Sequence, residues 1–250
     1  QIRSTGMSRQ NVENGLSMLQ TADSWLQKIN DMLGRMHELG VEAGDGTKTT
    51  TDISNIQSEF TELQSEINRI TTGTTSAAKY NGLYLFRGGN GRTTDSAAVG
   101  LSVQIGADVG QKVKIDLKVL DAENTSQKAD DLTYTKTTGS SATVNWASVI
   151  TSKSTLSVGD TNAIGKVAAA IDHISNSRAT LGAQQNRLKE TQGGLLAYED
   201  NLRSAESKVR DVDMASESTK FSKYQILSQI SNAMLAQANQ LPGSALQLLG

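Results

Sequence analysis

A repeated apolar position between residues 164 and 212 constrains this chain more than any other feature. The repeat has a period of seven, so its members fall on one helical stripe every two turns. They are Val167, Ile174, Leu181, Leu188, Leu195, Leu202 and Val209. At about 1.5 Å per residue, a helix of this length extends roughly 75 Å, which is too long for a compact core. The segment therefore predicts a rod helix that packs beside other helices.

The second stripe of this rod carries polar residues at its centre. Apolar residues occupy both ends of the stripe, but its middle positions are Arg178, Gln185 and Gln192. Polar side chains at seam positions weaken a purely internal core. We expect these three residues to contact neighbouring molecules.

Two further helices are predicted in the first third of the chain. Residues 8–43 carry two apolar tracks with a period of seven, and Gly40, Gly44 and Gly46 end the helix through a left-handed glycine cap. Asp52 can cap the next helix, in which the apolar residues alternate three and four apart. They are Ile53, Ile56, Phe60, Leu63, Ile67 and Ile70. The short connection predicts antiparallel packing, with the long rod as the third member.

Between residues 80 and 158 the periodicity changes to two. Strand-like runs occupy 83–86, 101–105 and 112–120, and the last two are predicted to pair as a hairpin. Asn81–Gly82 is a turn signal. Residues 121–158 are rich in Ser, Thr and Asp and are predicted as irregular surface, with one strand candidate from Thr143 to Ile150 that carries Trp146.

A last amphipathic helix is predicted before Pro242, which ends it. Its apolar face has no evident mate elsewhere in the chain. The face and the terminal leucines comprise Phe221, Ile226, Leu227, Ile230, Met234, Leu235, Leu241, Leu246, Leu248 and Leu249. An unmated apolar helix face indicates a partner supplied by another molecule.

Composition argues against catalysis, cofactors and metal binding. The chain has no cysteine and only two histidines, and Val41 stands where a zinc-protease motif beginning at His37 needs its second histidine. A net charge of −2 gives no nucleic-acid signal, and no apolar run approaches the length of a membrane span. With 36% hydrophobic but only 4% aromatic residues, narrow helical bundles are favoured over a thick core. We therefore predict that the protein is not an enzyme.

These patterns predict a mainly α fold. The expected architecture is an elongated antiparallel α-helical rod or bundle of coiled-coil type, with a smaller middle region that contains a β-hairpin. We divide the chain into amino-terminal rod helices (1–79), a hairpin and irregular surface region (80–158), a long rod helix (159–212) and a terminal assembly helix (213–250).

Both ends of the chain resemble bacterial flagellin. At the carboxyl end the match includes R-A-T-L-G-A-Q-Q-N-R-L (178–188), S-K-V-R-D-V-D-M-A (207–215) and the segment from Q-I-L-S-Q-I-S-N-A-M-L-A-Q-A-N-Q-L-P (225–242) to L-L-G. At the amino end it includes Q-N-V-E-N-G-L-S-M-L-Q-T-A-D-S-W-L (10–26), R-M-H-E-L-G-V-E-A (35–43), I-Q-S-E-F-T-E-L-Q-S-E-I-N-R-I (56–70) and Y-N-G-L-Y-L (80–85). The segments follow the family's order.

The resemblance implies a secreted, extracellular protein that self-assembles into the bacterial flagellar filament for swimming motility. It implies several partners: other flagellin subunits, an export chaperone bound by the terminal helix, the flagellar cap and hook-junction proteins, and a Toll-like innate immune receptor. The family's amino-terminal tube helix has no counterpart before Gln1. We therefore expect the terminal helix to lack its usual companion.

The family's subunit-contact and receptor-facing motif is matched at five positions. They are Arg35, Glu38, Leu39, Val41 and Glu59, while Gly34 and His37 depart from the pattern.

Two alternative functions remain open at this point. One is a hook–filament junction protein, which has similar termini, although the full A-Q-A-N-Q-L-P tail favours flagellin. The other is a flagellin-like surface adhesin or polysaccharide-binding protein, for which residues 87–158 offer only Tyr134 and Trp146 as aromatic contacts.

Overall fold

The computed structural model describes residues 1–72, 76–86, 101–117, 120, 131–135, 141–150, 156–160, 162–210 and 213–249. The chain forms two compact units, Gln1–Glu199 and Asp200–Gly250. The rod helix α4 (Ala163–Arg210) crosses the boundary between them, and α5 (Met214–Leu249) belongs to the second unit. The predicted start of the tail at residue 213 therefore falls inside the second unit.

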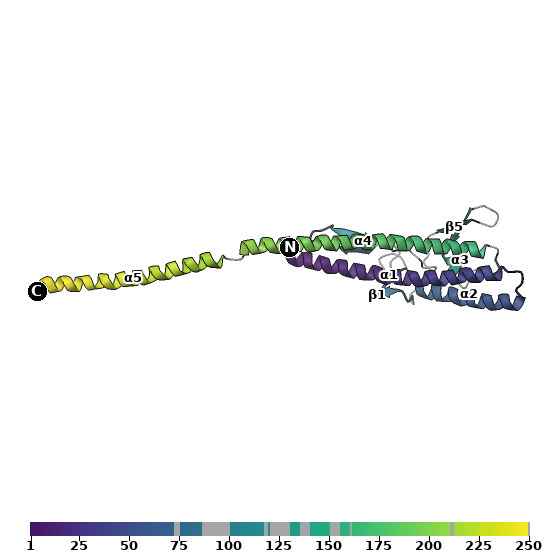
Figure 1. Ribbon diagram of the computed structural model, residues 1–250, viewed down its shortest axis with the longest axis horizontal. Helices are drawn as coiled ribbons and strands as arrows, with labels where there is room; N and C mark the ends of the chain where they lie inside the picture. Colours follow the sequence, from purple (N-terminus) through teal and green to yellow (C-terminus); the bar gives the residue numbers. More distant parts are fainter. Residues whose placement is uncertain are drawn as a thin grey trace. The chain divides into compact units, whose positions relative to one another are not determined.

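A bundle of long helices forms the frame of the first unit. Helix α1 (Ile2–Ala43) runs antiparallel to both α2 (Thr50–Thr71) and α4 (Figure 1). Ion pairs record the register, because Arg35 of α1 meets Glu59 of α2 while Arg9 of α1 meets Glu199 of α4. The structure confirms the predicted antiparallel helical bundle.

The helix ends differ in detail from the sequence predictions. Helix α1 begins at Ile2, six residues before the predicted start at residue 8, and its cap Gly44 has right-handed geometry with φ −73°. Asp52 is not the N-cap of α2. Thr49 takes that position, and Asp52 completes a reciprocal capping box by accepting a hydrogen bond from the Thr49 backbone N–H at 3.0 Å. A Thr-x-x-Asp pattern satisfies two backbone donors at once, which a single Asp cap would not.

The described strands pair as short antiparallel hairpins. Strand β1 (Lys79–Tyr80) pairs with β2 (Leu83–Tyr84), β3 (Leu101–Gln104) with β4 (Lys112–Ile115), and β5 (Asp131–Thr135) with β6 (Ser141–Asn145). The β3–β4 pairing confirms the predicted hairpin, although both strands are shorter than the alternating runs that predicted them. Asn81–Gly82 forms the predicted turn between β1 and β2.

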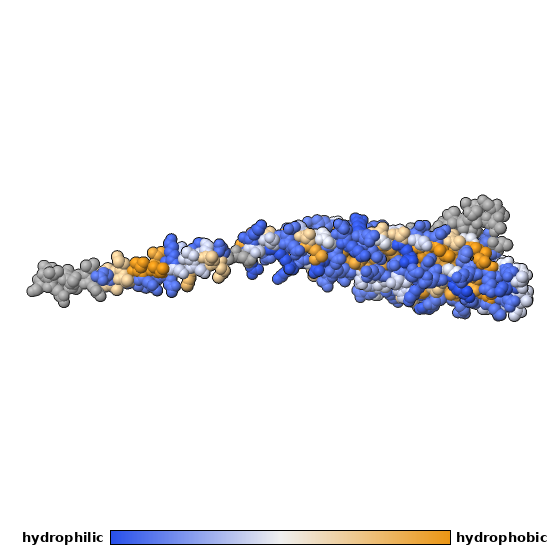
Figure 2. Space-filling model, viewed as in Figure 1, coloured by the Kyte–Doolittle hydropathy of each residue, from blue (hydrophilic) through white to orange (hydrophobic). Residues whose placement is uncertain are grey.

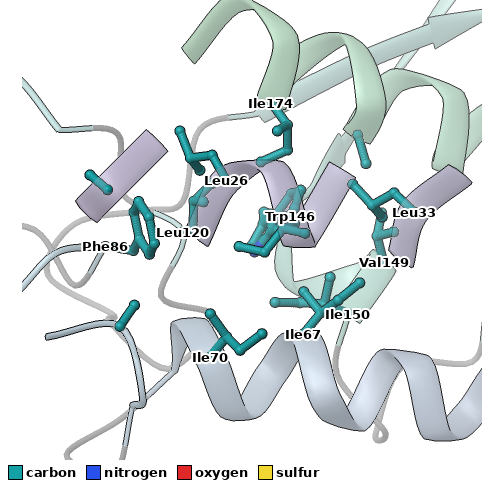
Figure 3. Close-up of a cluster of buried hydrophobic side chains, with 14 of the residues drawn as sticks. Leu26, Leu33, Ile67, Ile70, Phe86, Leu120, Trp146, Val149, Ile150 and Ile174 are labelled. Atoms are coloured by element: carbon teal, nitrogen blue, oxygen red, sulfur yellow. The ribbon is translucent and has the colours of Figure 1, made fainter. Parts of the chain in front are cut away.

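Residues 146–150 follow β6, and their described side chains are buried, so the prediction of irregular surface was wrong for this part. The strand ends at Asn145, and a turn then leads into the short helix α3 (Ala147–Ile150). Trp146, Val149 and Ile150 are each 0% exposed. Figure 3 shows these side chains filling the space among α1, α2 and α4. These side chains cover apolar surface that the three helices would otherwise expose to water.

The apolar stripe of α4 is buried along only part of its length. Val167, Ile174, Leu181 and Leu188 are at most 2% exposed, whereas Val209 is 90% exposed. Glu199, the last residue of the first unit, forms an ion pair with Arg9 near the start of α1. The expected core stripe therefore ends within the first unit.

Helix α5 continues through Pro242 to Leu249, which corrects the prediction that this proline ends the helix. A proline removes one backbone donor and crowds the preceding turn. The helical hydrogen bonds on both sides of it can still form, and the helix resumes.

Candidate assembly surfaces

The predicted subunit-contact motif places a charged cluster on the outside of the α1–α2 pair. Arg35 Nε donates to Glu59 Oε1 at 2.7 Å and Nη2 donates to Glu59 Oε2 at 3.1 Å, a bidentate pair between the helices. Arg35 Nη1 also donates to Glu38 Oε2 at 3.1 Å. The hydrogen bond from Arg35 lowers the pKa of Glu59. Its three side chains are 46% to 69% exposed and available to a partner.

The two apolar members of the motif point in opposite directions. Val41 is 55% exposed near the end of α1, the helix that also carries Arg35 and Glu38. Leu39 is 1% exposed and belongs to the core. This corrects the expected outward orientation of Leu39. It lies three residues after Met36 on the buried face of α1, so the helical period turns it inward.

Two of the three polar seam residues of α4, Arg178 and Gln192, bond within the chain. Arg178 Nε donates to Asp23 Oδ1 of α1 at 2.8 Å, and this bond raises the arginine's pKa. Gln192 Nε2 donates to Glu13 Oε1 of α1 at 3.2 Å. Gln185 is half-buried on the same helix. Arg178 and Gln192 thus fix the register of α1 against α4, and only their remaining exposed surface can face a neighbouring molecule.

Two glutamines of α2 have an anchoring role that the sequence reasoning missed. Gln64 is 2% exposed, and its Nε2 donates to the Val149 carbonyl oxygen at 2.8 Å. Gln57 Oε1 accepts hydrogen bonds from the Ser157 hydroxyl at 2.8 Å and the Val158 backbone N–H at 2.7 Å. Their seven-residue spacing places both on one face of α2 beside the apolar seam. That spacing was the available signal in the sequence. The hydrogen bonds of the two glutamines hold Val149, Ser157 and Val158 against α2.

The second unit presents an exposed apolar helix. Phe221, Ile226, Leu227, Ile230, Met234 and Leu235 of α5 are between 46% and 69% exposed. Figure 2 shows hydrophobic surface, in orange, on part of α5. Leu227, Ile230 and Met234 follow one another at spacings of three and four, so they share a stripe. The other predicted members of the surface, Leu241, Leu246, Leu248 and Leu249, lie outside the described side chains.

A shallow groove of about 350 Å³ opens between α1, the β1–β2 turn and β3. Its lining includes Asn11 and Asn14 of α1, Asn81 of the turn, and Ser102 and Gln104 of β3. Asn11 Nδ2 donates to the Gln104 carbonyl oxygen at 3.3 Å, which ties the hairpin to the helix. All the lining residues of this groove in the described structure are uncharged.

The described residues offer no centre for metal chemistry and no transmembrane helix. No group of three or more His, Cys, Asp or Glu side chains converges among them. None of the helices in this part of the chain combines the length and hydropathy that crossing a bilayer requires.

Packed heptad helices joined to an exposed apolar helix define a class of structural proteins that assemble through helix packing. Comparison with known proteins identifies the family within this class. A sequence profile described as the bacterial flagellin N-terminal helical region matches residues 1–91, and one described as the bacterial flagellin C-terminal helical region matches residues 164–249.

Curated relatives match over the whole chain. Flagellin from Bacillus subtilis (strain 168) is 39% identical over 260 residues, which cover 100% of this chain and 82% of that protein. Flagellin FlaB2 from Treponema pallidum (strain Nichols) is 36% identical and covers 100% of this chain and 81% of its own. The crystal structure of Xanthomonas campestris FlgL shares the fold, with a TM-score of 0.52 at 17% identity over 83% of this chain and 97% of that chain.

The chain therefore belongs to the bacterial flagellin family. Its function is that of a structural subunit of the flagellar filament, and it self-assembles with other flagellin subunits. The hook–filament junction and adhesin alternatives are not favoured by these matches.

Proposed function

We propose that the subunit assembles through two separate surfaces. One is the apolar stripe of α5 around Ile230, and the other is the charged cluster of Arg35, Glu38 and Glu59 with Val41 beside it. The first surface supplies affinity through buried apolar area, and the second supplies register through charge complementarity.

The exposed apolar side chains of α5 carry this proposal. Burying a side chain such as Leu, Ile or Met stabilises an interface by about 1.5–3 kcal/mol. Ile230 and Met234 are 52% and 66% exposed, so each retains half or more of that contribution for a partner. A helix gains most of its stability in proteins from packing of an apolar face rather than from propensity. We infer that the stripe is covered by helices of neighbouring subunits in the filament.

The charged cluster contributes through specificity. An exposed ion pair adds little to the stability of its own chain, because water and salt screen it. When a partner excludes water from the cluster, the electrostatic interactions of these charges become stronger. A partner that brings like charges together is then disfavoured. The bidentate Arg35–Glu59 pair fixes the donor and acceptor positions that a neighbour would meet.

The same surfaces suit the partners that the family resemblance suggests. We propose that α5 binds an export chaperone before assembly, and that the filament contacts the flagellar cap and hook-junction proteins. We also propose that the Arg35 cluster is the contact for a Toll-like receptor. The protein would be secreted and extracellular, with no enzymatic activity and no cofactor.

The decisive experiment compares matched lysine substitutions on α5. The double variant Ile230→Lys/Met234→Lys places charges in the apolar stripe, while Asn232→Lys adds a charge roughly half a turn away on an exposed position. Polymer formed by the purified chain is measured by sedimentation and electron microscopy, and chaperone binding by calorimetry. We expect the double variant to lose both polymer and chaperone binding, and Asn232→Lys to keep both. Wild-type levels of polymer in the double variant would refute the assembly role of the stripe.

A second comparison separates the rod surface from the tail. Arg35→Ala removes the cluster's only cation, whereas Arg203→Ala removes a cation from the end of α4. We expect Arg35→Ala to weaken polymerisation while leaving chaperone binding by α5 unchanged. Equal effects of the two substitutions on polymerisation would show that Arg35 contributes only a positive charge and no specific contact.

A further inference from the structure

The β1–β2 hairpin presents the dipeptide Asn81–Gly82 at its tip. Asn81 has φ 48° and Gly82 has φ 79°, and the register pairs Tyr80 with Leu83 around them. Both turn residues are exposed, and both lie outside the paired positions of the two strands. We propose that Asn81 is a site of spontaneous deamidation, at which the Gly82 backbone nitrogen converts the asparagine amide into a carboxylate.

The reaction needs only water besides the two residues. Hydroxide or water takes the Gly82 amide proton. The Gly82 nitrogen then attacks Asn81 Cγ, a bond forms between these atoms, and the bond from Cγ to Nδ2 breaks. Nδ2 takes up a proton and leaves as ammonia, so a five-membered cyclic imide remains. Water then adds to either imide carbonyl and opens the ring to aspartate or to isoaspartate. Glycine permits the attack because it has no side chain to shield its nitrogen.

The same dipeptide occurs at Asn14–Gly15, in a different backbone setting. Both asparagines line the groove between α1, the turn and β3, so solvent reaches both side chains. Gly15, however, is buried inside α1, where its backbone nitrogen donates the helical hydrogen bond to the residue four positions earlier. A turn tip opens locally at small cost, whereas a helix interior opens only at a free energy approaching global unfolding. The fold therefore protects Asn14 and leaves Asn81 reactive.

The two products would affect the hairpin differently. Aspartate tolerates a positive φ, so it keeps the turn and adds a carboxylate to a groove whose described lining is uncharged. Isoaspartate adds a methylene to the main chain, and the two-residue turn no longer matches the register of Tyr80 with Leu83. The Leu85 backbone N–H, which donates to the Ala78 carbonyl oxygen at 3.0 Å, lies just beyond the following pair, Lys79 with Tyr84. Isoaspartate therefore loosens the hairpin where it enters the core.

Peptide mapping of the whole chain tests the proposal without any variant. Trypsin cleaves after Lys79 and Arg87, so the peptide 80–87 contains Asn81 as its only asparagine. The peptide 10–28 contains Asn14 together with Asn11, and fragment ions assign the amide loss to one or the other. A third Asn-Gly step, Asn90–Gly91, lies outside the described residues and falls in a different peptide. The folded protein is incubated in mildly acidic and mildly alkaline buffers, and mass spectrometry follows amide loss against a zero-time control.

We expect Asn81 to convert at least about tenfold faster than Asn14 in the folded protein. Peptide 80–87 should yield both aspartate and isoaspartate, with faster conversion in the alkaline buffer. Denaturant should bring the two rates together, because unfolding removes the helix that protects Gly15. Equal rates at the two asparagines in the folded protein, or an intact Asn81 when Asn14 has reacted, would overturn the proposal. The variant Asn81→Gln, which disfavours the five-membered ring, should abolish conversion in peptide 80–87.

Discussion

Gly193 and Gly194 form a weak point in the long helix α4, and replacing them with alanine should stabilise it. Both glycines are exposed in the helix interior. A Cβ atom built on either would meet nothing within 4 Å among the described residues outside the local helix backbone. Packing therefore gives no reason for glycine at these positions. On either side of the two glycines α4 contacts α1, through a hydrogen bond from Gln192 and an ion pair of Glu199.

The size of the effect follows from helix propensity. Glycine in a helix interior destabilises the helix by about 1 kcal/mol relative to alanine, because glycine loses more backbone conformational freedom on folding. With open space around both positions, Gly193→Ala/Gly194→Ala should recover about 2 kcal/mol of local stability. At 1.4 kcal/mol for each factor of ten, amide exchange around residues 190–198 should slow roughly 30-fold.

Hydrogen exchange measured by mass spectrometry tests this prediction, with Gly15→Ala as the matched control. A Cβ at Gly15 would lie 3.2 Å from Val103 Cγ2 and 3.5 Å from Leu188 Cδ1, so crowding should offset the propensity gain. We expect no net stabilisation from Gly15→Ala. Unchanged exchange in the Gly193/Gly194 double variant would refute the reasoning, as would equal stabilisation by Gly15→Ala.

Three further predictions concern the first unit and use urea unfolding followed by tryptophan fluorescence, since Trp146 is buried in its core. Gln64→Leu leaves the buried Val149 carbonyl oxygen without its side-chain donor and should cost about 1–3 kcal/mol of unfolding free energy. Phe60→Ala removes a side chain that is 0% exposed and should cost about 3–5 kcal/mol. The Lys166 ammonium and the Asn162 backbone N–H hold the pKa of Asp160 below its ordinary value of 3.8. Its stabilising contribution is therefore present above that pH and is lost as the pH falls through the lower folded value, so wild type should lose more stability on acidification than Asp160→Asn.

Each of these predictions has a control or a contrary outcome. Gln10→Leu, on an exposed position of α1, should change stability by no more than about 0.5 kcal/mol. A loss in Gln64→Leu as small as this would remove the anchoring role of Gln64. A cost below about 1 kcal/mol for Phe60→Ala would mean that the cavity collapses freely. Parallel acid profiles of wild type and Asp160→Asn would contradict the proposed pKa depression.

Local periodicity determined most of the fold. The heptad stripes predicted α1, α2 and α4, and the alternating runs predicted β3 and β4. The unmated apolar stripe of α5 was also visible in the sequence, because an amphipathic helix displays its face whatever covers it. These features depend on residues a few positions apart, so a single segment carries the whole signal.

Only the tertiary structure decided which distant residues meet. The sequence placed Arg178 on a seam, but its bond to Asp23, 155 residues away in the chain, depends on the register of α1 against α4. Trp146 follows a Ser- and Thr-rich stretch, yet it is buried because the gap among three helices needs filling. Leu39 faces inward although it lies between exposed members of a contact motif. In each case the stabilisation comes from burying apolar surface or forming an ion pair between segments that are far apart in the sequence. Local sequence patterns do not specify which distant segments meet.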